Sequence, residues 1–394
     1  MQKLIDFKCP LCDFTDFEHL YKFNTSVMIN SEITNWEYEH IICNNCAVIM
    51  VYPPPSKKIL DEYYENTFPF ELNNFQKRQI NAAHFINDEI NPAEKNVFDI
   101  GAGDGFLLKQ FADAGWKCNG IEPSNAMTKK AFKKNNIKII NKNFEDFFKT
   151  EIDTKYNLVT MSHVLEHVYF PENIIKNIRE MLTEDGFLYI EVPSVEGFAN
   201  EKINNEIMSF THLWHYTVSS LTNLIQKQGF KKIKIETAVE NDFPVIRSIF
   251  QREKKIYDNN IGNNEISQTK DYFLKMVNIR NKRKIETVKK IKLLFEKEKP
   301  VIFYGAGVDM YDLMNSHNTF MKNFDYYLVD SNPKKQGKSL NDKIIENPRI
   351  ILSFDKPIIC ITSRLIALKE SIRQSISDLK IKDLEVIDLF DNHV

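Results

Sequence analysis

Short apolar runs alternate with amphipathic segments through the middle of the chain. The runs have the length of buried strands, and they fall at residues 97–100, 118–121, 137–140, 158–161 and 187–192. Between them, apolar residues recur with the period of a helix. Strands that alternate with helices favour a mostly parallel sheet with helices on both faces. The pattern therefore predicts a doubly wound, Rossmann-like α/β domain.

The flanking regions have other patterns. Helical spacing covers residues 57–64 and 75–90, and it returns in a segment rich in Lys, Glu and Asn. A fresh apolar run at 300–304 opens a second alternation of strands and helices. We therefore expect four parts: a small N-terminal module at 1–55, a central α/β domain with a helical lead-in at 56–246, a helical connector at 247–299 and a second Rossmann-like α/β domain at 300–394.

Composition sets the class of protein and its partners. A chain of 394 residues exceeds the usual size of one hydrophobic core, and 43% hydrophobic with 27% charged residues is typical of a globular protein. The net charge of −2 gives no basic excess to neutralise a phosphate backbone, which argues against nucleic acid as a partner. No apolar run of signal-peptide or membrane-spanning length is seen. We expect a cytoplasmic protein without a membrane partner, as a monomer or small homo-oligomer.

Four of the six cysteines form two C-x-x-C pairs that bracket one short segment, Cys9 with Cys12 and Cys43 with Cys46. In a reducing cytoplasm such pairs are more often metal ligands than disulfides, because each short turn directs two thiolates at one tetrahedral ion. A redox pair, or a chance spacing, is the alternative. Since sulfur would fill all four positions, we expect a structural zinc ion that stabilises the module and takes no part in catalysis.

The first strand of the central domain ends in a turn with three glycines, Gly101, Gly103 and Gly105. Without Cβ atoms, such a turn lets a ligand lie against backbone N–H groups at the carboxyl edge of a parallel sheet. By itself the turn also suits a dinucleotide. Glu122 ends the next strand, where its carboxylate can accept hydrogen bonds from two ribose hydroxyls. The sequence therefore predicts a site for a ligand that contains a ribose.

The segment after the third strand offers two more candidates. Asn143 and Phe144 are placed to flank an adenine ring. Asn143 equally suits a helix cap or a turn, and Phe144 equally suits the core. Both alternatives stay open at this point.

Across residues 95–237 the sequence resembles the class I S-adenosylmethionine-dependent methyltransferases. The resemblance rests on the Asp-x-Gly-x-Gly-x-Gly turn at 99–105, on Glu122, on Val164-Leu-Glu-His167 and on the later Met181-Leu-x-x-x-Gly186. It implies that the cofactor is S-adenosylmethionine, with its methionine part on the glycine turn and its ribose on the acid. The cofactor-binding residues expected on this basis are Asp99, Gly101, Ala102, Gly103, Gly105, Glu122, Pro123, Asn143, Phe144 and Ser162.

Over nearly the whole chain, the order of the parts resembles the zinc-containing methyltransferases of nucleotide-linked sugars, several of which transfer to carbon. The resembling features are the Cys43-x-x-Cys46 pair before Tyr52-Pro-Pro-Pro55 and the later Tyr304-Gly-Ala-Gly307 turn. The resemblance implies methylation of a nucleotide-linked sugar for a surface polysaccharide or glycosylated metabolite. It also implies a C-terminal domain that helps to enclose this substrate, and a purely structural turn there is the alternative.

An acceptor hydroxyl or C–H group must lose its proton as it meets the sulfonium methyl, and histidine suits the role of general base because its pKa lies near neutrality. His167 and His212 match the two pocket histidines of the sugar C-methyltransferases. Tyr64, or its neighbour Tyr63, is a candidate for that family's N-terminal tyrosine, and packing in the core is the alternative for both. Ser209 and Thr211 replace the tyrosine and glutamate of the family's Tyr-x-Glu-His motif. The choice between oxygen and carbon as acceptor therefore stays open.

A competing hypothesis is a non-catalytic, zinc-stabilised binding or adaptor protein that keeps the methyltransferase fold. For each histidine, the matching alternative is a buried residue with a structural hydrogen bond. The complete set of three glycines and Glu122 argues against the adaptor hypothesis, because a pocket without a cofactor does not need them all.

Overall fold

The computed structural model describes residues 7–29, 32–65, 74–149, 154–203, 205–209, 211–257, 261–316, 318–340, 342–364, 366–381 and 383–390. Contacts divide the chain into two compact units. Unit 1 comprises Met1–Tyr21, Glu39–Asn200 and Ile207–Lys275, and unit 2 comprises Lys22–Tyr38, Glu201–Glu206 and Met276–Val394. Both units take residues from more than one of the four parts expected from the sequence, and that division stays a prediction.

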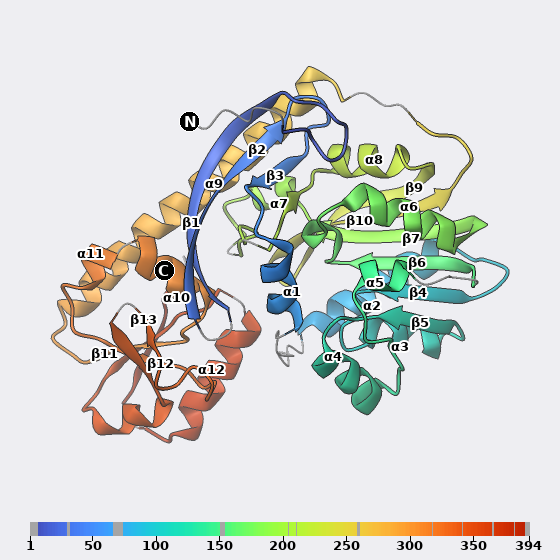
Figure 1. The fold of residues 1–394 in the computed structure, drawn as a ribbon. Helices are drawn as coiled ribbons and strands as arrows, with labels where there is room; N and C mark the ends of the chain where they lie inside the picture. Colours follow the sequence, from blue (N-terminus) through green and yellow to red (C-terminus); the bar gives the residue numbers. More distant parts are fainter. Residues whose placement is uncertain are drawn as a thin grey trace. The chain divides into compact units, whose positions relative to one another are not determined.

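The central element of unit 1 is a mixed six-stranded sheet in the order β5-β4-β6-β7-β10-β9 (Figure 1). Its strands are β4 (Asn96–Ile100), β5 (Lys117–Ile121), β6 (Tyr156–Ser162), β7 (Leu182–Pro193), β9 (Phe230–Glu240) and β10 (Phe243–Arg252). The first four in the order are parallel, and β10 is antiparallel to both of its neighbours. The predicted α/β fold with a mostly parallel sheet is confirmed for this unit.

Two details of this sheet differ from the expectation. The run at 137–140 forms only one bridge, between Ile121 and Ile140, because a π-helical turn at Ala131–Asn135 and a left-handed residue, Asn136, bring the chain to the sheet late. Strand β10 continues past residue 246, so the connecting helix starts only at α9 (Asn263–Phe295). Sequence periodicity alone did not separate the end of this strand from the polar segment that follows.

Helices cover both faces of the central sheet. The helices of unit 1 are α1 (Lys57–Glu65), α2 (Asn74–Glu89), α3 (Phe106–Asp113), α4 (Asn125–Lys130), α5 (Phe144–Phe148), α6 (Pro171–Met181), α7 (Val195–Phe198) and α8 (Val218–Gln226). Neighbouring strand residues point to opposite faces. Val97 joins the apolar cluster of α2 and α3, whereas Phe98 stacks on Phe147 of α5 with ring centroids 5.0 Å apart.

A second, four-stranded sheet has the order β1-β2-β3-β8. Its strands are β1 (Phe17–Ile29), β2 (Glu32–Cys43), β3 (Ile49–Tyr52) and β8 (Trp214–His215). In β3, Ile49 pairs with His215 and Met50 pairs with Trp214. The strand that follows the second cysteine pair is therefore hydrogen-bonded to the segment that carries the candidate histidines.

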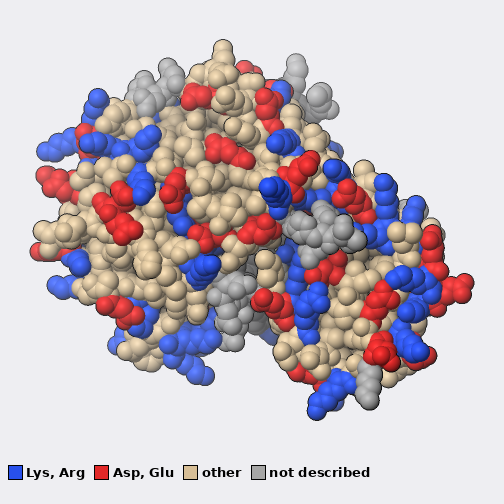
Figure 2. All heavy atoms as spheres, turned by 180° about the vertical axis from the view of Figure 1, so that it is seen from behind, with Lys and Arg blue, Asp and Glu red and all other residues tan. Residues whose placement is uncertain are grey.

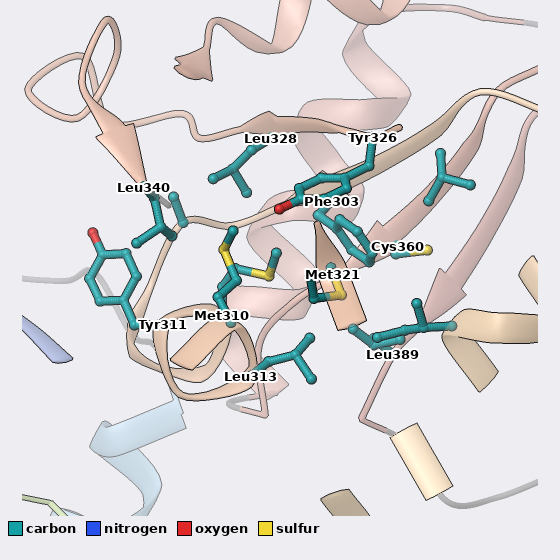
Figure 3. Packing of buried hydrophobic residues seen from close by; sticks show 14 of the residues in the cluster. Phe303, Met310, Tyr311, Leu313, Met321, Tyr326, Leu328, Leu340, Cys360 and Leu389 are labelled. Carbon is teal, nitrogen blue, oxygen red and sulfur yellow. The ribbon is translucent and has the colours of Figure 1, made fainter. Parts of the chain in front are cut away.

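Unit 2 holds a six-stranded sheet in the order β13-β14-β12-β11-β15-β16, parallel except for β13. Its elements are β11 (Val301–Tyr304), β12 (Tyr327–Val329), β13 (Ser339–Leu340), β14 (Lys343–Glu346), β15 (Ile358–Ile361), β16 (Glu385–Asp388), α10 (Val308–Ser316), α11 (Asn318–Met321) and α12 (Ile366–Asp378). Apolar side chains such as Phe303, Leu328 and Leu389 pack together in one of its cores (Figure 3). Burial of such side chains is the main stabilising contribution to this unit.

None of the described helices is both long enough and apolar enough to cross a membrane. Charged side chains of both signs are interspersed over the face of the molecule that Figure 2 shows. That face therefore carries no continuous basic surface of the kind that follows a nucleic-acid backbone.

Candidate functional site

The glycine turn between β4 and α3 has a backbone that other residues fit poorly. Gly101, Gly103 and Gly105 have φ angles of 73°, 53° and 71°, in the left-handed region. The N–H groups of Gly101 and Ala102 both donate to the carbonyl of Ile121, at 3.0 and 2.9 Å, and fix the turn to the end of β5. A Cβ atom on Gly101 would lie 2.4 Å from Val164 Cγ2. The turn therefore depends on glycine for both its conformation and its space.

Glu122 is held directly against this turn. Its Oε2 accepts a hydrogen bond from the N–H of Gly103 at 3.0 Å, and its Oε1 accepts one from the N–H of Ser124 at 2.8 Å. Burial raises the pKa of Glu122, and the two N–H donors oppose that rise. The carboxylate is thus fixed at the carboxyl end of β5, where an acid can hold a ribose.

Three predicted residues lie behind the turn and do not line the cavity beside it. Asp99 is 3% exposed and accepts a hydrogen bond from Thr160 Oγ1 at 2.7 Å. Burial raises the pKa of Asp99 to about 7, and the charge of Glu122 adds to the rise. Ala102 is buried as well, and Ser162 donates to Glu191 Oε1 at 3.1 Å. These residues support the turn and the sheet from within.

A cavity of about 210 Å³ opens beside the turn at the carboxyl ends of β4, β5 and β6. It is lined by Lys57, Leu60, Asp61, Ile100, Gly101, Ile121, Glu122, Pro123, Lys142, Asn143, Phe144, Glu145, His163, Val164, His167, Val168 and Tyr169. Five of the ten predicted cofactor residues and one predicted catalytic histidine are among them. In open α/β sheets, this edge is where ligands bind.

Asn143 combines the two roles that its sequence context left open. It lines the cavity, and its Oδ1 also accepts a hydrogen bond from the N–H of Asp146 at 2.8 Å as the cap of α5. Beside it, Glu145 pairs with Lys57 of α1 at 2.6 Å. Helix α1 contributes Lys57, Leu60 and Asp61 to the cavity lining. No signal in the sequence identified this part of the lining, because these residues look like those of any amphipathic helix. Tyr64 lies in α1, but its side chain falls outside the described part of the chain.

A second hollow of about 280 Å³, between α5 and α6, shares Phe144 and Glu145 with the first. Its lining includes Phe148, Phe170 and Asn173, without a glycine turn, a strand-end acid or a histidine. The glycine turn, the strand-end acid and the histidines converge only in the first of these two cavities.

Histidines gather at the end of β6. His167 lines the cavity, and its Nδ1 lies 2.8 Å from the carbonyl oxygen of Thr211. A carbonyl can only accept, so Nδ1 donates and Nε2 is the basic nitrogen of the ring. His212 is partly buried and packs edge-on against His167 with ring centroids 4.8 Å apart. Burial lowers the pKa of both histidines, which makes them neutral at neutral pH.

His163 also lines the cavity, although it is not one of the two histidines that match the sugar C-methyltransferases. Its φ angle of 53° is unusual for a residue other than glycine, and such strain is concentrated at functional sites. Its Nδ1 donates to Glu166 Oε1 at 3.2 Å, and its Nε2 lies 3.5 Å from Glu191 Oε1. No property of the sequence could reveal this backbone conformation.

Glu166 lies at the centre of the cluster and is 1% exposed. Burial alone would raise the pKa of Glu166. The positive charges of His167 and His163 outweigh burial and lower the pKa from 4.5 to about 2. Its Oε1 also lies 3.6 Å from His167 Nε2. The cluster therefore combines one buried carboxylate with three imidazole rings, those of His163, His167 and His212.

The segment that carries His212 is fixed on two sides. On one side, the N–H of Val51 in β3 donates to the carbonyl of Leu213 at 3.0 Å. On the other, Trp214 Nε1 donates to the carbonyl of Val168 at 2.6 Å. The position of His212 therefore depends on the strand that follows the second cysteine pair.

The four cysteines of the two pairs come together in space, and all remain free thiols. Cys9 Sγ lies 3.7 Å from Cys46 Sγ, Cys12 Sγ lies 3.5 Å from Cys43 Sγ, and all four sulfurs lie within 4.8 Å of one another. In a tetrahedral zinc site with bonds near 2.3 Å, sulfurs are about 3.8 Å apart. The donor set therefore fits zinc.

The two cysteine turns also share one backbone form. The N–H of Asp13 donates to the carbonyl of Cys9 at 2.8 Å, and the N–H of Ala47 donates to the carbonyl of Cys43 at 3.0 Å. Asp13 and Ala47 both have left-handed φ angles, of 57° and 54°. Two matching turns that point four thiols at one centre fit a single tetrahedral ion.

Comparisons with known proteins agree with this geometry. Residues 75–235 match the family model described as a methyltransferase domain. An uncharacterized methyltransferase of Staphylococcus carnosus is 26% identical over 193 residues, which cover 48% of this chain and 89% of that protein. The ubiquinone biosynthesis O-methyltransferase of Glaesserella parasuis is 34% identical over 115 residues, and the chain spans about half of its length, 49%.

Among solved structures, a magnesium protoporphyrin IX methyltransferase from Synechocystis is 14% identical, covers 51% of this chain and 99% of its own, and has a TM-score of 0.40. The family match covers the glycine turn, Glu122 and the histidines of the cluster. Residues 75–235 are therefore a methyltransferase domain, and the protein is an S-adenosylmethionine-dependent methyltransferase.

Proposed function

We propose that this enzyme transfers the methyl group of S-adenosylmethionine to a nucleotide-linked sugar, in the synthesis of a surface polysaccharide or glycosylated metabolite. The observation that carries the proposal is one cavity in which the cofactor-binding groups and an acceptor-activating group meet. Gly101 and Glu122 lie on one side of it, and His167 and His163 reach it from the end of β6. The sugar class rests on the resemblance of the cysteine pairs and of the order of parts to the sugar methyltransferases.

His167 and His212 are the residues that we propose activate the acceptor. The acceptor must become electron-rich as it approaches the methyl carbon in line with the departing sulfur. His167 is neutral at neutral pH, and its proton on Nδ1 leaves Nε2 as the basic nitrogen. His212 packs edge-on against the ring of His167 and so helps to hold that ring in place.

A hydroxyl oxygen is the acceptor that the surroundings of His212 favour. The hydroxyls of Ser209 and Thr211 hydrogen-bond to each other at 2.9 Å. They bring neither a phenol nor a carboxylate to stabilise an enolate, which carbon methylation beside a keto group requires. Removal of a hydroxyl proton makes a smaller demand on the site.

We propose further that the four cysteines hold a structural zinc ion. Its role would be to fold the N-terminal sheet and, through β3, to hold the segment of His212. With all four positions filled by sulfur, such an ion has no open position for a substrate.

Mass spectrometry of the product tests the function. Purified enzyme, labelled S-adenosylmethionine and a panel of nucleotide-linked sugars, both keto and fully hydroxylated, are combined. A labelled methyl ether supports the proposal, and label on carbon corrects the acceptor. His212→Ala should abolish transfer, while His84→Ala, at an exposed position on α2, should not. Normal cofactor binding without any methylated sugar would refute the substrate class.

A further inference from the structure

The Glu166, His167 and His212 side chains present their basic atoms to one small space. One ligand atom from each lies within 4.8 Å of the others. Two histidines and one carboxylate are a common ligand set for divalent transition-metal ions, with open positions left for a substrate. This set is separate from the four cysteines, which use thiolates only.

The spacing between Glu166 and His167 suits a shared ion. His167 Nδ1 lies 2.8 Å from the carbonyl oxygen of Thr211, and its Nε2 lies 3.6 Å from Glu166 Oε1. In a tetrahedral site with bonds near 2.1 Å, the two atoms would be about 3.4 Å apart.

Two further polar atoms in the cluster are buried without a hydrogen bond. Within the described part of the chain, the buried Glu166 Oε2 and His212 Nδ1 have no hydrogen-bond partner. Burial of a polar atom without a partner costs about 1 to 3 kcal/mol, and a bound ion removes that cost. The Thr211 carbonyl that accepts from His167 is also what a metal-bound histidine requires, because that bond fixes the ring orientation.

We infer that Glu166, His167 and His212 bind a divalent transition-metal ion beside the cofactor cavity, and that this ion activates the acceptor oxygen. The inference rests on the proposed methyl transfer and assigns His167 and His212 as ligands of the ion, in place of His167 Nε2 as the base. The ion polarises the acceptor hydroxyl, whose O–H bond breaks with loss of the proton to water. The oxygen lone pair then forms the bond to the methyl carbon, and the C–S electron pair stays on sulfur, which gives S-adenosylhomocysteine.

Metal analysis of the full-length enzyme tests the inference. After dialysis against zinc and removal of the unbound ion, the wild type should hold two ions per chain, one on the cysteines and one on this cluster. Glu166→Gln and His212→Ala should each hold one and should bind S-adenosylhomocysteine normally, which shows that they fold. His84→Ala should hold two. One ion in the wild type, or two in both cluster variants, would overturn the inference.

Cobalt identifies the site that is filled. Co²⁺ added to enzyme whose cysteine site already holds zinc should give the weak ligand-field bands of nitrogen and oxygen ligands, without thiolate charge transfer. Loss of a ligand in His212→Ala should weaken Co²⁺ binding by more than about 100-fold. Sugar methylation by enzyme without the second ion would overturn the inference and leave a histidine base. A second ion without sugar methylation would overturn only the proposed substrate.

Discussion

Substitution of Gly101 by alanine separates two costs that the structure assigns to the cofactor turn. The alanine would have a φ angle of 73°, and its Cβ would meet Val164 Cγ2 at 2.4 Å. The left-handed backbone costs about 1 to 2 kcal/mol for a residue with a Cβ atom. Overpacking against Val164 adds about 1 to 3 kcal/mol. We therefore expect Gly101→Ala to destabilise the domain by about 2 to 5 kcal/mol.

A double-mutant cycle tests this reasoning. Val164→Ala removes the atom that the new Cβ would meet. In the double variant, Gly101→Ala should therefore no longer cause the loss of stability from overpacking and should still cause the loss from the left-handed backbone. Gly115→Ala is the matched control, because Gly115 has a φ angle of 82° but no atom within 4 Å of the place that a Cβ would take. It should lose only about 1 to 2 kcal/mol.

The measurement is urea unfolding, followed through the transition that S-adenosylhomocysteine shifts to higher urea, because that transition reports the domain with the turn. Coupling between Gly101→Ala and Val164→Ala of at least about 1 kcal/mol is expected. Additivity within about 0.5 kcal/mol would show that the two residues do not meet, and it would refute the geometry assigned to the turn.

Three further predictions follow from the site. Asp99 has its pKa raised from 3.8 to about 7, so its carboxyl should cost on the order of 4 kcal/mol of stability as pH rises from 4 to 7; the stability of the wild type relative to Asp99→Asn, from unfolding at several pH values, should fall by that amount, and a constant difference would contradict the raised pKa. Glu122→Gln should weaken S-adenosylhomocysteine binding about tenfold or more in calorimetry, since its amide opposes one of two N–H donors, and unchanged affinity would contradict the ribose role. Cys46→Ser should lose one zinc ion and most activity, whereas its cofactor affinity should persist.

Much of the fold could be predicted because the sequence expresses it locally. The run at 97–100 became β4, and the three glycines that follow it became a left-handed turn, since both depend on residues close in sequence. The same holds for the cysteines, where each C-x-x-C pair closes its own turn. Periodicity failed at 137–140, where the length of the preceding helical turn decided how much of the run reached the sheet.

Only those site residues that lie close in sequence to the glycine turn or to the end of a strand could be predicted. Glu122 was recognisable because it ends a strand, but the α1 wall at Lys57 and Leu60 was not, because no local pattern shows which helix closes a cavity. The meeting of Glu166 with His212 depends on β8 pairing with β3, a contact between distant parts of the chain. The N-terminal cysteines are therefore linked to the segment of His212, the proposed acceptor side of the site, through strand β3. A change at the proposed zinc site should reach His212 before it reaches the glycine turn, which is fixed independently by β5.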